Sequence, residues 1–337
     1  MTRRGWALFV AMAIIWGIPY LLIKIAVGEL TPASLVLLRT AIGAALLLPV
    51  AAARGWLRPL FPYWPWVLAY TVVEVSLPWF LLSDAERRLS SSLTGLIIAA
   101  VPLIGAVLQQ LTRGDDGLDR RRVAGLLVGL TGVAVLLGLN VTFRDLGAVS
   151  EVGLVALGYA TGPIIIARRL PNLPAVGVVA ASLALTAVLY APLALPQLPR
   201  ALPSGQVLLA LLILGVVCTA LAFLLFFALI GEVGPVRATV ITYFNPAVAL
   251  VLGVALLHEP FTLGAVVGFS LILLGSVLAT RRTSALAGSA AVPIIEPLGS
   301  CSTRYTRAAA PSPRIRKMTD ITKSAMNAIR FAAYTVR

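Results

Sequence analysis

Ten apolar stretches of about twenty residues, joined by short polar connections, restrict what this chain can fold into more than any other feature. A helix needs about 20 apolar residues to cross the hydrocarbon core of a bilayer. Leu, Val, Ala and Ile lie on all sides of each stretch, and the stretches lack the period-two alternation of a β-barrel strand. We therefore predict an all-α polytopic membrane protein whose transmembrane helices lie at residues 6–27, 34–53, 66–82, 92–111, 123–139, 149–167, 175–195, 206–230, 238–257 and 261–280.

The composition agrees with this fold and excludes other classes of protein. Of the 337 residues, 59% are hydrophobic and 12% are charged, and the mean hydropathy is +0.97. Soluble domains are about 45–50% apolar and about 25% charged, so a soluble enzyme, a disordered chain and a secreted disulfide scaffold are excluded. Cys218, Cys301 and His258 form no metal-binding pattern, and no phosphate-binding glycine loop occurs. We expect no metal, no cofactor, no catalytic residues and no direct use of ATP.

The formal net charge of +14 indicates an orientation rather than a nucleic-acid partner, because most of the arginines lie at the ends of apolar stretches. If the N-terminus is inside, thirteen arginines lie on the inner side: Arg3, Arg4, Arg54, Arg58, Arg113, Arg120, Arg121, Arg122, Arg168, Arg169, Arg237, Arg281 and Arg282. Four then lie outside: Arg87, Arg88, Arg144 and Arg200. The positive-inside rule therefore predicts a multi-pass protein of the inner (cell) membrane with both termini in the cytoplasm, contacting lipid and not nucleic acid.

The second half of the chain repeats the first. A shift of 144 residues places Pro19 on Pro163, Lys24 on Arg168 and Pro102 on Pro246. The first four stretches then fall on the sixth to ninth, and the fifth falls on the tenth after a five-residue correction. Since five is an odd number, the two repeats must cross the membrane in opposite directions, which is typical of secondary transporters.

The repeat defines three regions. We predict five-helix repeats at residues 6–139 and 149–281, followed by a basic cytoplasmic tail at 283–337. Ala, Ser, Pro and Arg dominate the start of the tail, which favours disorder. The alternative for residues 318–336 is a basic helix that lies on anionic lipid.

Several short motifs resemble those of the drug/metabolite transporter superfamily, within it the ten-helix proteins built of two EamA-type repeats. These motifs are Trp16-Gly17, Leu38-Arg39, the proline-centred fourth and ninth stretches, and His258-Glu259-Pro260 before the last stretch. The matching link of the first half, 112–116, lacks the glutamate. The resemblance covers about residues 6–281. It implies efflux of a small organic metabolite or drug, and it names no particular cargo.

A membrane scaffold or an intramembrane enzyme remains the alternative to a transporter. An enzyme should carry paired carboxylates, a nucleophile with its base, or metal ligands within the spans, and we find none. A scaffold needs neither an internal repeat nor charges inside the membrane. We therefore predict a transporter with a small-molecule cargo, possible proton coupling and no enzymatic activity.

Glu74 is the main candidate for the transport site. It lies midway along the third stretch, with Tyr70 one turn before it on the same face. A carboxylate in hydrocarbon costs several kcal/mol unless it faces a cavity or a partner. We interpret Glu74 as a proton carrier or as the receptor for a cationic cargo. A protonated carboxyl that hydrogen-bonds between helices is the alternative.

Other polar and aromatic residues are further candidates. Thr242, Tyr243 and Asn245 precede Pro246 at mid-depth and could bind cargo or join helices. Trp16 could stack on cargo or anchor its helix at the membrane interface. Two cations lie in the outer half: Arg39 could attract anions or bind a backbone carbonyl, and Lys24 is expected to reach the lipid headgroups.

Prolines and glycines predict how the helices bend and pack. Pro19, Pro102, Pro163 and Pro246 each remove a backbone hydrogen bond, and we expect four kinks facing a central cavity. The fifth and tenth stretches carry matching small-residue faces, which predicts close packing inside one chain or a homodimer seam. These faces consist of Gly125, Gly129, Gly132, Gly264, Gly268 and Gly275. The charged connections at 84–88 and 232–237 are expected to be solvated or to act as gates.

Overall fold

The computed structural model of this chain describes residues 1–113, 120–140 and 142–280. Ten helical spans in these residues are long and apolar enough to cross a membrane, and no β-strand occurs among them. Each span corresponds to one predicted stretch, so the chain is an all-α polytopic membrane protein with two inverted five-helix repeats. The predicted tail at 283–337 lies outside the described residues, as does Cys301.

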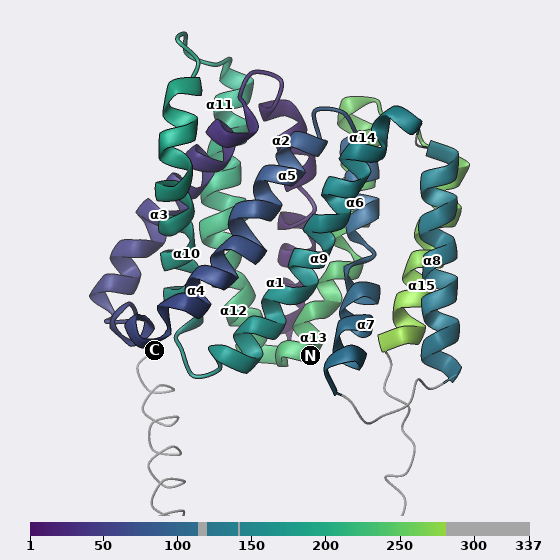
Figure 1. Cartoon of the computed structure of the whole chain (residues 1–337), viewed down its shortest axis with the longest axis horizontal. Helices are drawn as coiled ribbons and strands as arrows, with labels where there is room; N and C mark the ends of the chain where they lie inside the picture. The colour runs from purple at the N-terminus through teal and green to yellow at the C-terminus, as the bar shows by residue number, and fades with distance from the viewer. Residues whose placement is uncertain (114–119, 141, 281–337) are drawn as a thin grey trace, which may run out of the picture. The chain divides into compact units, whose positions relative to one another are not determined.

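Figure 1 labels the α-helices of the first repeat, which is built of ten helical segments. They are α1 (Arg3–Ile15), α2 (Pro19–Ala26), α3 (Pro32–Ala53), η1 (Arg58–Tyr63), α4 (Trp64–Tyr70), η2 (Thr71–Ser76), α5 (Leu77–Ala85), α6 (Ser91–Ile98), α7 (Val101–Arg113) and α8 (Arg120–Asn140). Span one is α1 with α2, span two is α3, span three runs from η1 to α5, span four is α6 with α7, and span five is α8.

The second repeat contains the remaining segments. They are η3 (Phe143–Asp145), α9 (Leu146–Arg169), α10 (Ala175–Ala194), η4 (Leu195–Gln197), α11 (Gly205–Leu212), η5 (Ile213–Leu221), α12 (Ala222–Val233), α13 (Pro235–Ala238), η6 (Thr239–Tyr243), α14 (Asn245–Leu257) and α15 (Leu263–Thr280). Span six is α9, span seven is α10 with η4, span eight runs from α11 to α12, span nine is η6 with α14, and span ten is α15.

Three of the four paired prolines mark an interruption of a span. Pro19 is the first residue of α2, and Pro102 and Pro246 are the second residues of α7 and α14. Proline is tolerated at these positions because the first amides of a helix have no intrahelical acceptor. The α9 helix instead continues through Pro163 without interruption. Spans four and nine therefore share the same interruption, whereas span one is interrupted and its equivalent, span six, is continuous.

Spans three and eight each contain a π-helical segment, η2 and η5. The 144-residue shift places Thr71–Ser76 on residues 215–220, which lie inside Ile213–Leu221. The two repeats thus share a widened helical turn at equivalent positions. Such segments are rare, and they occur frequently at functional sites.

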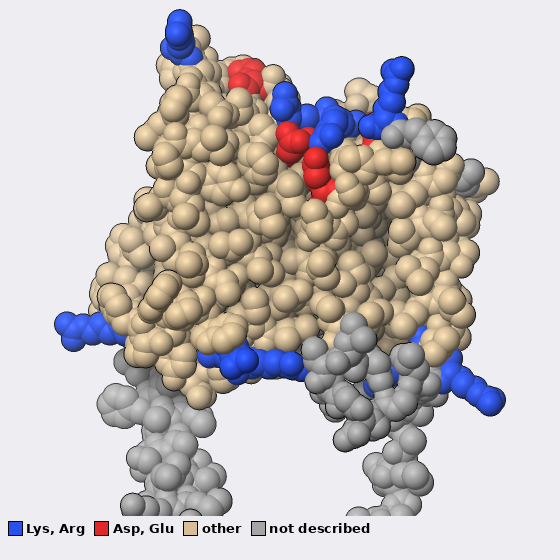
Figure 2. Space-filling model, in the orientation of Figure 1, with Lys and Arg blue, Asp and Glu red and all other residues tan. Residues whose placement is uncertain are grey.

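Charged side chains gather at the two ends of the bundle, and a broad band between them carries none on the side that Figure 2 shows. We call the end that includes Arg3, Arg54, Arg168 and Arg237 the Arg-rich face. The opposite end, the mixed-charge face, contains Lys24, Asp84, Glu86, Arg88, Glu151 and Glu259. The uncharged band is the part of the surface that suits the hydrocarbon core of a bilayer.

The glycine faces of spans five and ten pack against each other within one chain. A Cβ on Gly125 would lie 2.8 Å from the Gly275 carbonyl oxygen, and one on Gly132 would lie 2.8 Å from that of Gly268. Backbones approach this closely only when the side chain is a hydrogen atom. The seam is therefore intramolecular, and a homodimer stays a prediction.

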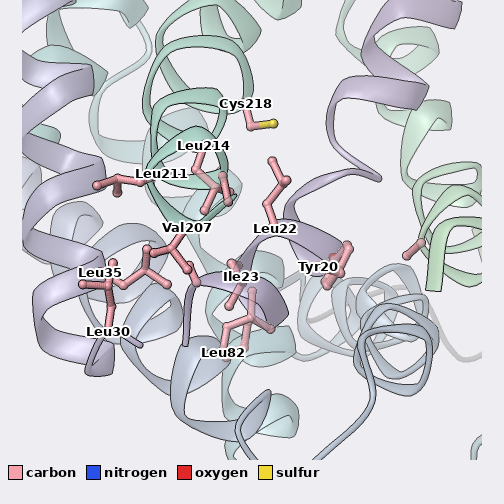
Figure 3. Packing of buried hydrophobic residues seen from close by; sticks show 14 residues of the cluster. Tyr20, Leu22, Ile23, Leu30, Leu35, Leu82, Val207, Leu211, Leu214 and Cys218 are labelled. Atoms are coloured by element: carbon pink, nitrogen blue, oxygen red, sulfur yellow. The ribbon is translucent and has the colours of Figure 1, made fainter. Parts of the chain in front are cut away.

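The main core cluster joins the two repeats. Figure 3 shows Leu22 of α2 close to Leu214 and Cys218 of η5, and Tyr20 and Ile23 of α2 belong to the same cluster. Leu82 of α5 and Val155 of α9 belong to the same cluster. Span one therefore packs with span eight, so the repeats interlock.

Candidate functional site

Glu74 lies in the π-helical segment of span three and faces span six. Its Oε2 atom is buried and has no hydrogen-bond partner among the described residues. A Cβ added to Gly162 of α9 would contact Oε2 and would lie 2.7 Å from Cδ of the glutamate. The carboxyl group thus fills the space that a glycine leaves open at the boundary between the repeats.

The π-turn explains why Glu74 points this way. Thr71 and Ser76 both reach α10: the Thr71 hydroxyl donates to Ser182 Oγ at 2.9 Å, and Ser76 Oγ lies 2.7 Å from Thr186 Oγ1. Residues five apart on an ordinary α-helix are rotated by about 140° from each other, so they could not both face α10. The π-turn brings them to one side and leaves Glu74 on another, towards α9.

Two tyrosines, one buried and one partly buried, lie near Glu74. Tyr70, on α4, is 5% exposed and interacts electrostatically with Glu74. Tyr159, on α9, interacts with Glu74, Arg39 and Glu86. Tyr70 was predicted from its spacing to Glu74, whereas Tyr159 was not predicted, although it lies one turn before Pro163 and between Gly158 and Gly162.

Arg39 is a buried cation near the same region. It is 7% exposed, its guanidinium carbon lies 3.8 Å from the centroid of the Trp79 ring, and its Nε donates to Thr219 Oγ1 at 3.0 Å. The Thr219 hydroxyl in turn donates to the Leu214 carbonyl within η5 at 2.8 Å. Arg39 therefore connects span two to both π-containing spans through a hydroxyl and a ring, rather than through the backbone carbonyl that we considered.

The other predicted site residues do not converge on Glu74. With its amide nitrogen facing them, Asn245 donates to the carbonyls of Ala13, at 3.1 Å, and of Ile241, at 3.0 Å. The break in span one accounts for the first contact, because the amide of Gly17 donates to Ile14 and not to Ala13. Asn245 thus joins span nine to span one.

The neighbours of Asn245 also contact helices. The Thr242 hydroxyl donates to the Thr239 carbonyl at 2.8 Å, and the Tyr243 hydroxyl lies 3.2 Å from Thr280 Oγ1 of span ten. Trp16 packs on Phe223 and Phe226 of span eight, with ring centroids 5.9 and 4.7 Å away. The Thr242 bond therefore stays within η6, whereas Tyr243 joins span nine to span ten and Trp16 joins span one to span eight.

The mixed-charge face differs from the expectation of a solvated loop. Glu86 is 0% exposed, and neither of its carboxylate oxygens has a hydrogen-bond partner among the described residues. The Lys24 ammonium donates to the carbonyls of Glu86, at 2.6 Å, and Leu89, at 2.8 Å. It thereby satisfies carbonyls that the end of α5 leaves open, so our expectation that Lys24 reaches the headgroups was wrong.

Glu259 closes the same face from the other repeat. Its two oxygens accept hydrogen bonds from the amides of Ser91, at 2.7 Å, and Ser92, at 2.9 Å, at the start of α6. His258 ends α14 in a left-handed conformation with φ of 54°, and this turns the chain so that Glu259 reaches α6. The glutamate of the His-Glu-Pro motif is therefore a helix cap supplied from a distant span.

Further contacts join the repeats at both ends. On the mixed-charge face, Arg88 donates to Glu151 of α9 at 2.6 Å and to Asp84 at 2.8 Å. On the Arg-rich face, the hydroxyl of Thr2 donates to Glu232 at the end of α12. Arg88 and Glu232 are equivalent under the 144-residue shift. The ends of spans three and eight thus each bind the start of the span that opens the other repeat.

Two small cavities lie away from Glu74. One, of about 80 Å³, is lined by Ser90, Ser92, Thr262 and neighbouring apolar residues. The other, of about 260 Å³, lies beside Trp56, Val176 and Phe227. Neither is lined by Glu74 or Arg39. With contacts closed at both ends, the described residues form a conformation in which the Oε2 atom of Glu74 is buried.

Comparisons with known proteins agree with this fold. The profile of the EamA-like transporter family matches residues 3–138 and 151–281. The chain is similar to the uncharacterized transporter YvbV of Bacillus subtilis (strain 168), with 27% identity over 81% of this chain and 90% of the relative. It is also similar to the uncharacterized inner membrane transporter YedA of Escherichia coli (strain K12), with 28% identity over 74% and 81%.

A solved crystal structure shares the fold. It aligns with a TM-score of 0.60 and 24% sequence identity, over 82% of this chain and 96% of the other. This likeness concerns the backbone arrangement alone.

Proposed function

Since this chain belongs to the EamA-like transporter family and is a membrane transporter, we propose that it exports a small organic molecule across the cytoplasmic membrane by alternating access, driven by protons that bind Glu74. The N-terminus and the Arg-rich face lie in the cytoplasm, as the arginine distribution supports. The mixed-charge face then lies outside.

The buried Oε2 atom of Glu74, which has no hydrogen-bond partner among the described residues, is the observation that carries the proposal. An ionised carboxylate without a partner is costly in hydrocarbon, so the enclosed conformation requires the neutral form. If spans three and six separate, water reaches the carboxyl group and the proton can leave. Protonation of Glu74 therefore favours enclosure, and deprotonation favours opening.

The contacts between the repeats suggest which parts move. Arg88–Glu151 on one face and Thr2–Glu232 on the other would have to break in turn for each side to open. Asn245 and Trp16 hold span one against spans nine and eight. We assign them to this moving junction, and we assign Glu74, Tyr70 and Arg39 to the region that meets the cargo and the proton.

The first experiment identifies the cargo and tests Glu74 together. Cells that overproduce the native chain, Glu74→Gln or Cys218→Ser are compared by untargeted mass spectrometry of medium and cytosol. Cys218 is the matched control because it occupies the equivalent position in the other repeat. We expect a compound enriched in the medium with the native chain and with Cys218→Ser, and loss of its pH-dependent export with Glu74→Gln.

The outcomes separate the alternatives. Equal export by native protein and Glu74→Gln, with unchanged pH dependence, would contradict proton coupling through Glu74 and leave transport intact. Uptake of a compound from the medium would contradict the direction. If the protein is a scaffold, its overproduction should change the level of no compound, although the protein is present in the membrane. Cysteine pairs introduced at each of the two faces should then not cross-link in different states.

A further inference from the structure

Buried polar atoms without partners gather at the mixed-charge face. Among the described residues, four of the seven such side-chain atoms belong to Glu86, Ser91 and Ser92. These residues are 0%, 0% and 4% exposed. Buried polar groups are nearly always hydrogen-bonded in proteins, so this cluster requires an explanation that the proposed role of Glu74 does not supply.

Glu86 lies where several elements of both repeats meet. Lys24 of α2 binds its backbone carbonyl, and Glu259, which follows α14, interacts with its side chain electrostatically. Arg39 of α3, Tyr20 of α2 and Tyr159 of α9 are the other titratable or charged groups that interact with it. Asp84, Arg87 and Arg88, its charged neighbours on its own element, bind one another or Glu151 instead.

An ionised Glu86 would be poorly stabilised in this arrangement. The ammonium of Lys24 already donates to two carbonyls, and Glu259 adds a second negative charge. No ion pair joins Glu86 to a cation in the described part of the chain. A neutral carboxyl group avoids the cost of a buried unpaired charge.

We propose that Glu86 is a second proton-binding site, which holds a proton while the outer end of the transporter is closed and releases it when that end opens. The inference rests on the alternating access proposed above and deepens it. Tyr159 and its neighbour Tyr20 lie within electrostatic reach of Glu86, and Tyr159 also interacts with Glu74. Tyr159 therefore lies within electrostatic reach of both carboxyl groups.

The direction of the pH effect follows from burial. Desolvation raises the pKa of Glu86 well above its ordinary value in the closed form, with Lys24 opposing the shift and Glu259 adding to it. When the face opens, water lowers the pKa again. Closure is therefore favoured at low pH and is lost as pH rises through the raised pKa of the closed form. Linkage of one proton changes the open-to-closed ratio by up to about tenfold per pH unit.

A cysteine at position 91 reports on this equilibrium. The Ser91 hydroxyl is buried and unpartnered, so Ser91→Cys removes no hydrogen bond from the closed form. The substitution is made in a Cys218→Ser, Cys301→Ser chain, and maleimide labelling is measured in lipid nanodiscs between about pH 6 and pH 9. We expect labelling, corrected for thiol ionisation with a small-molecule thiol, to accelerate by up to about tenfold per pH unit as the pH rises.

Two variants in the reporter chain separate this site from the Glu74 site. Glu86→Gln should make the corrected labelling rate slow and independent of pH, while Glu74→Gln should retain the acceleration. If Glu74→Gln removes the acceleration and Glu86→Gln keeps it, Glu86 is not the proton site, although the proposed function stands. If Glu86→Gln fails to fold, the reporter chain alone decides, because a pH-independent rate there overturns the proposal.

Replacing Na⁺ with choline at constant pH tests whether Glu86 binds a proton or a metal ion. We expect no change in labelling. A slower rate in Na⁺ that Glu86→Gln abolishes would assign the site to a metal ion instead of a proton and overturn the proposal.

Discussion

The π-helical segments of spans three and eight occupy equivalent positions in the two repeats but carry different chemistry. In span three the segment presents Glu74 to the boundary between the repeats, and its hydroxyls bind span seven. In span eight the equivalent of Glu74 is Cys218, buried in the main apolar cluster. The equivalent of Thr71 in span eight is Gly215, so a close backbone contact replaces the hydroxyl pair there: a Cβ on Gly215 would lie 2.6 Å from Ile42 Cγ2.

The comparison separates backbone shape from function. Both repeats retain the widened turn, so it belongs to the shared architecture, whereas the carboxyl group occurs in only one of them. Under the proposed proton coupling, the transporter would move symmetrically while it binds the proton on one side of its internal symmetry. Variants of these residues and their neighbours test whether export depends on the position of the carboxyl group or only on its presence.

Exchanging the two residues should give the largest effect. In a chain with Glu74→Cys and Cys218→Glu, the new carboxylate would lie near Arg39, which interacts with Cys218. A buried pair with Arg39 would hold it ionised, so it could not carry a proton through the cycle. We expect pH-dependent export to fall to background, measured with the identified cargo. Export as fast as the native rate would show that either π-segment can host the acid.

Gly162→Ala should have the next largest effect. Its Cβ would collide with the Glu74 carboxyl group, and overpacking of this kind costs about 1–3 kcal/mol. We expect slower export and a lower thermal midpoint in detergent. Gly153→Ala is the matched control, since nothing lies within 4 Å of a Cβ at that position of the same helix. Equal behaviour of the two variants would contradict the close fit of Glu74 to span six.

Loss of the hydroxyl pairs should have the smallest effect. Hydrogen bonds between transmembrane helices contribute about 0.6 kcal/mol on average. A double-mutant cycle of Thr71→Val and Ser182→Ala should therefore give a coupling of about that size in the free energy of unfolding. A coupling near zero would mean that the π-turn does not depend on this contact.

Much of the fold could be predicted from the sequence because apolar length and proline positions act locally. The ten spans, the interruptions next to Pro19, Pro102 and Pro246, and the seam of spans five and ten all follow from such signals. The same signals missed what depends on distant neighbours. Pro163 has the same residue type as Pro19, yet α9 remains continuous.

The site was less predictable than the fold. The position of Glu74 indicated a buried carboxyl, but the π-turn that aims it depends on Ser182 and Thr186 of another span. Glu86 lies in the charged connection at 84–88, whose sequence predicts exposure to solvent. Its burial results from the approach of Lys24 and of the segment containing Glu259, which are distant in the chain.

The seam between α8 and α15 has a consequence for how the protein is made. The α8 helix is complete at Asn140, but its partner α15 begins only at Leu263. Until the last span has been synthesised and inserted, the glycine face of α8 has no matching surface and lies against lipid or a chaperone. Completion of the bundle therefore waits for the last helix to be translated, and a chain that ends early carries an open glycine face which membrane quality control could recognise.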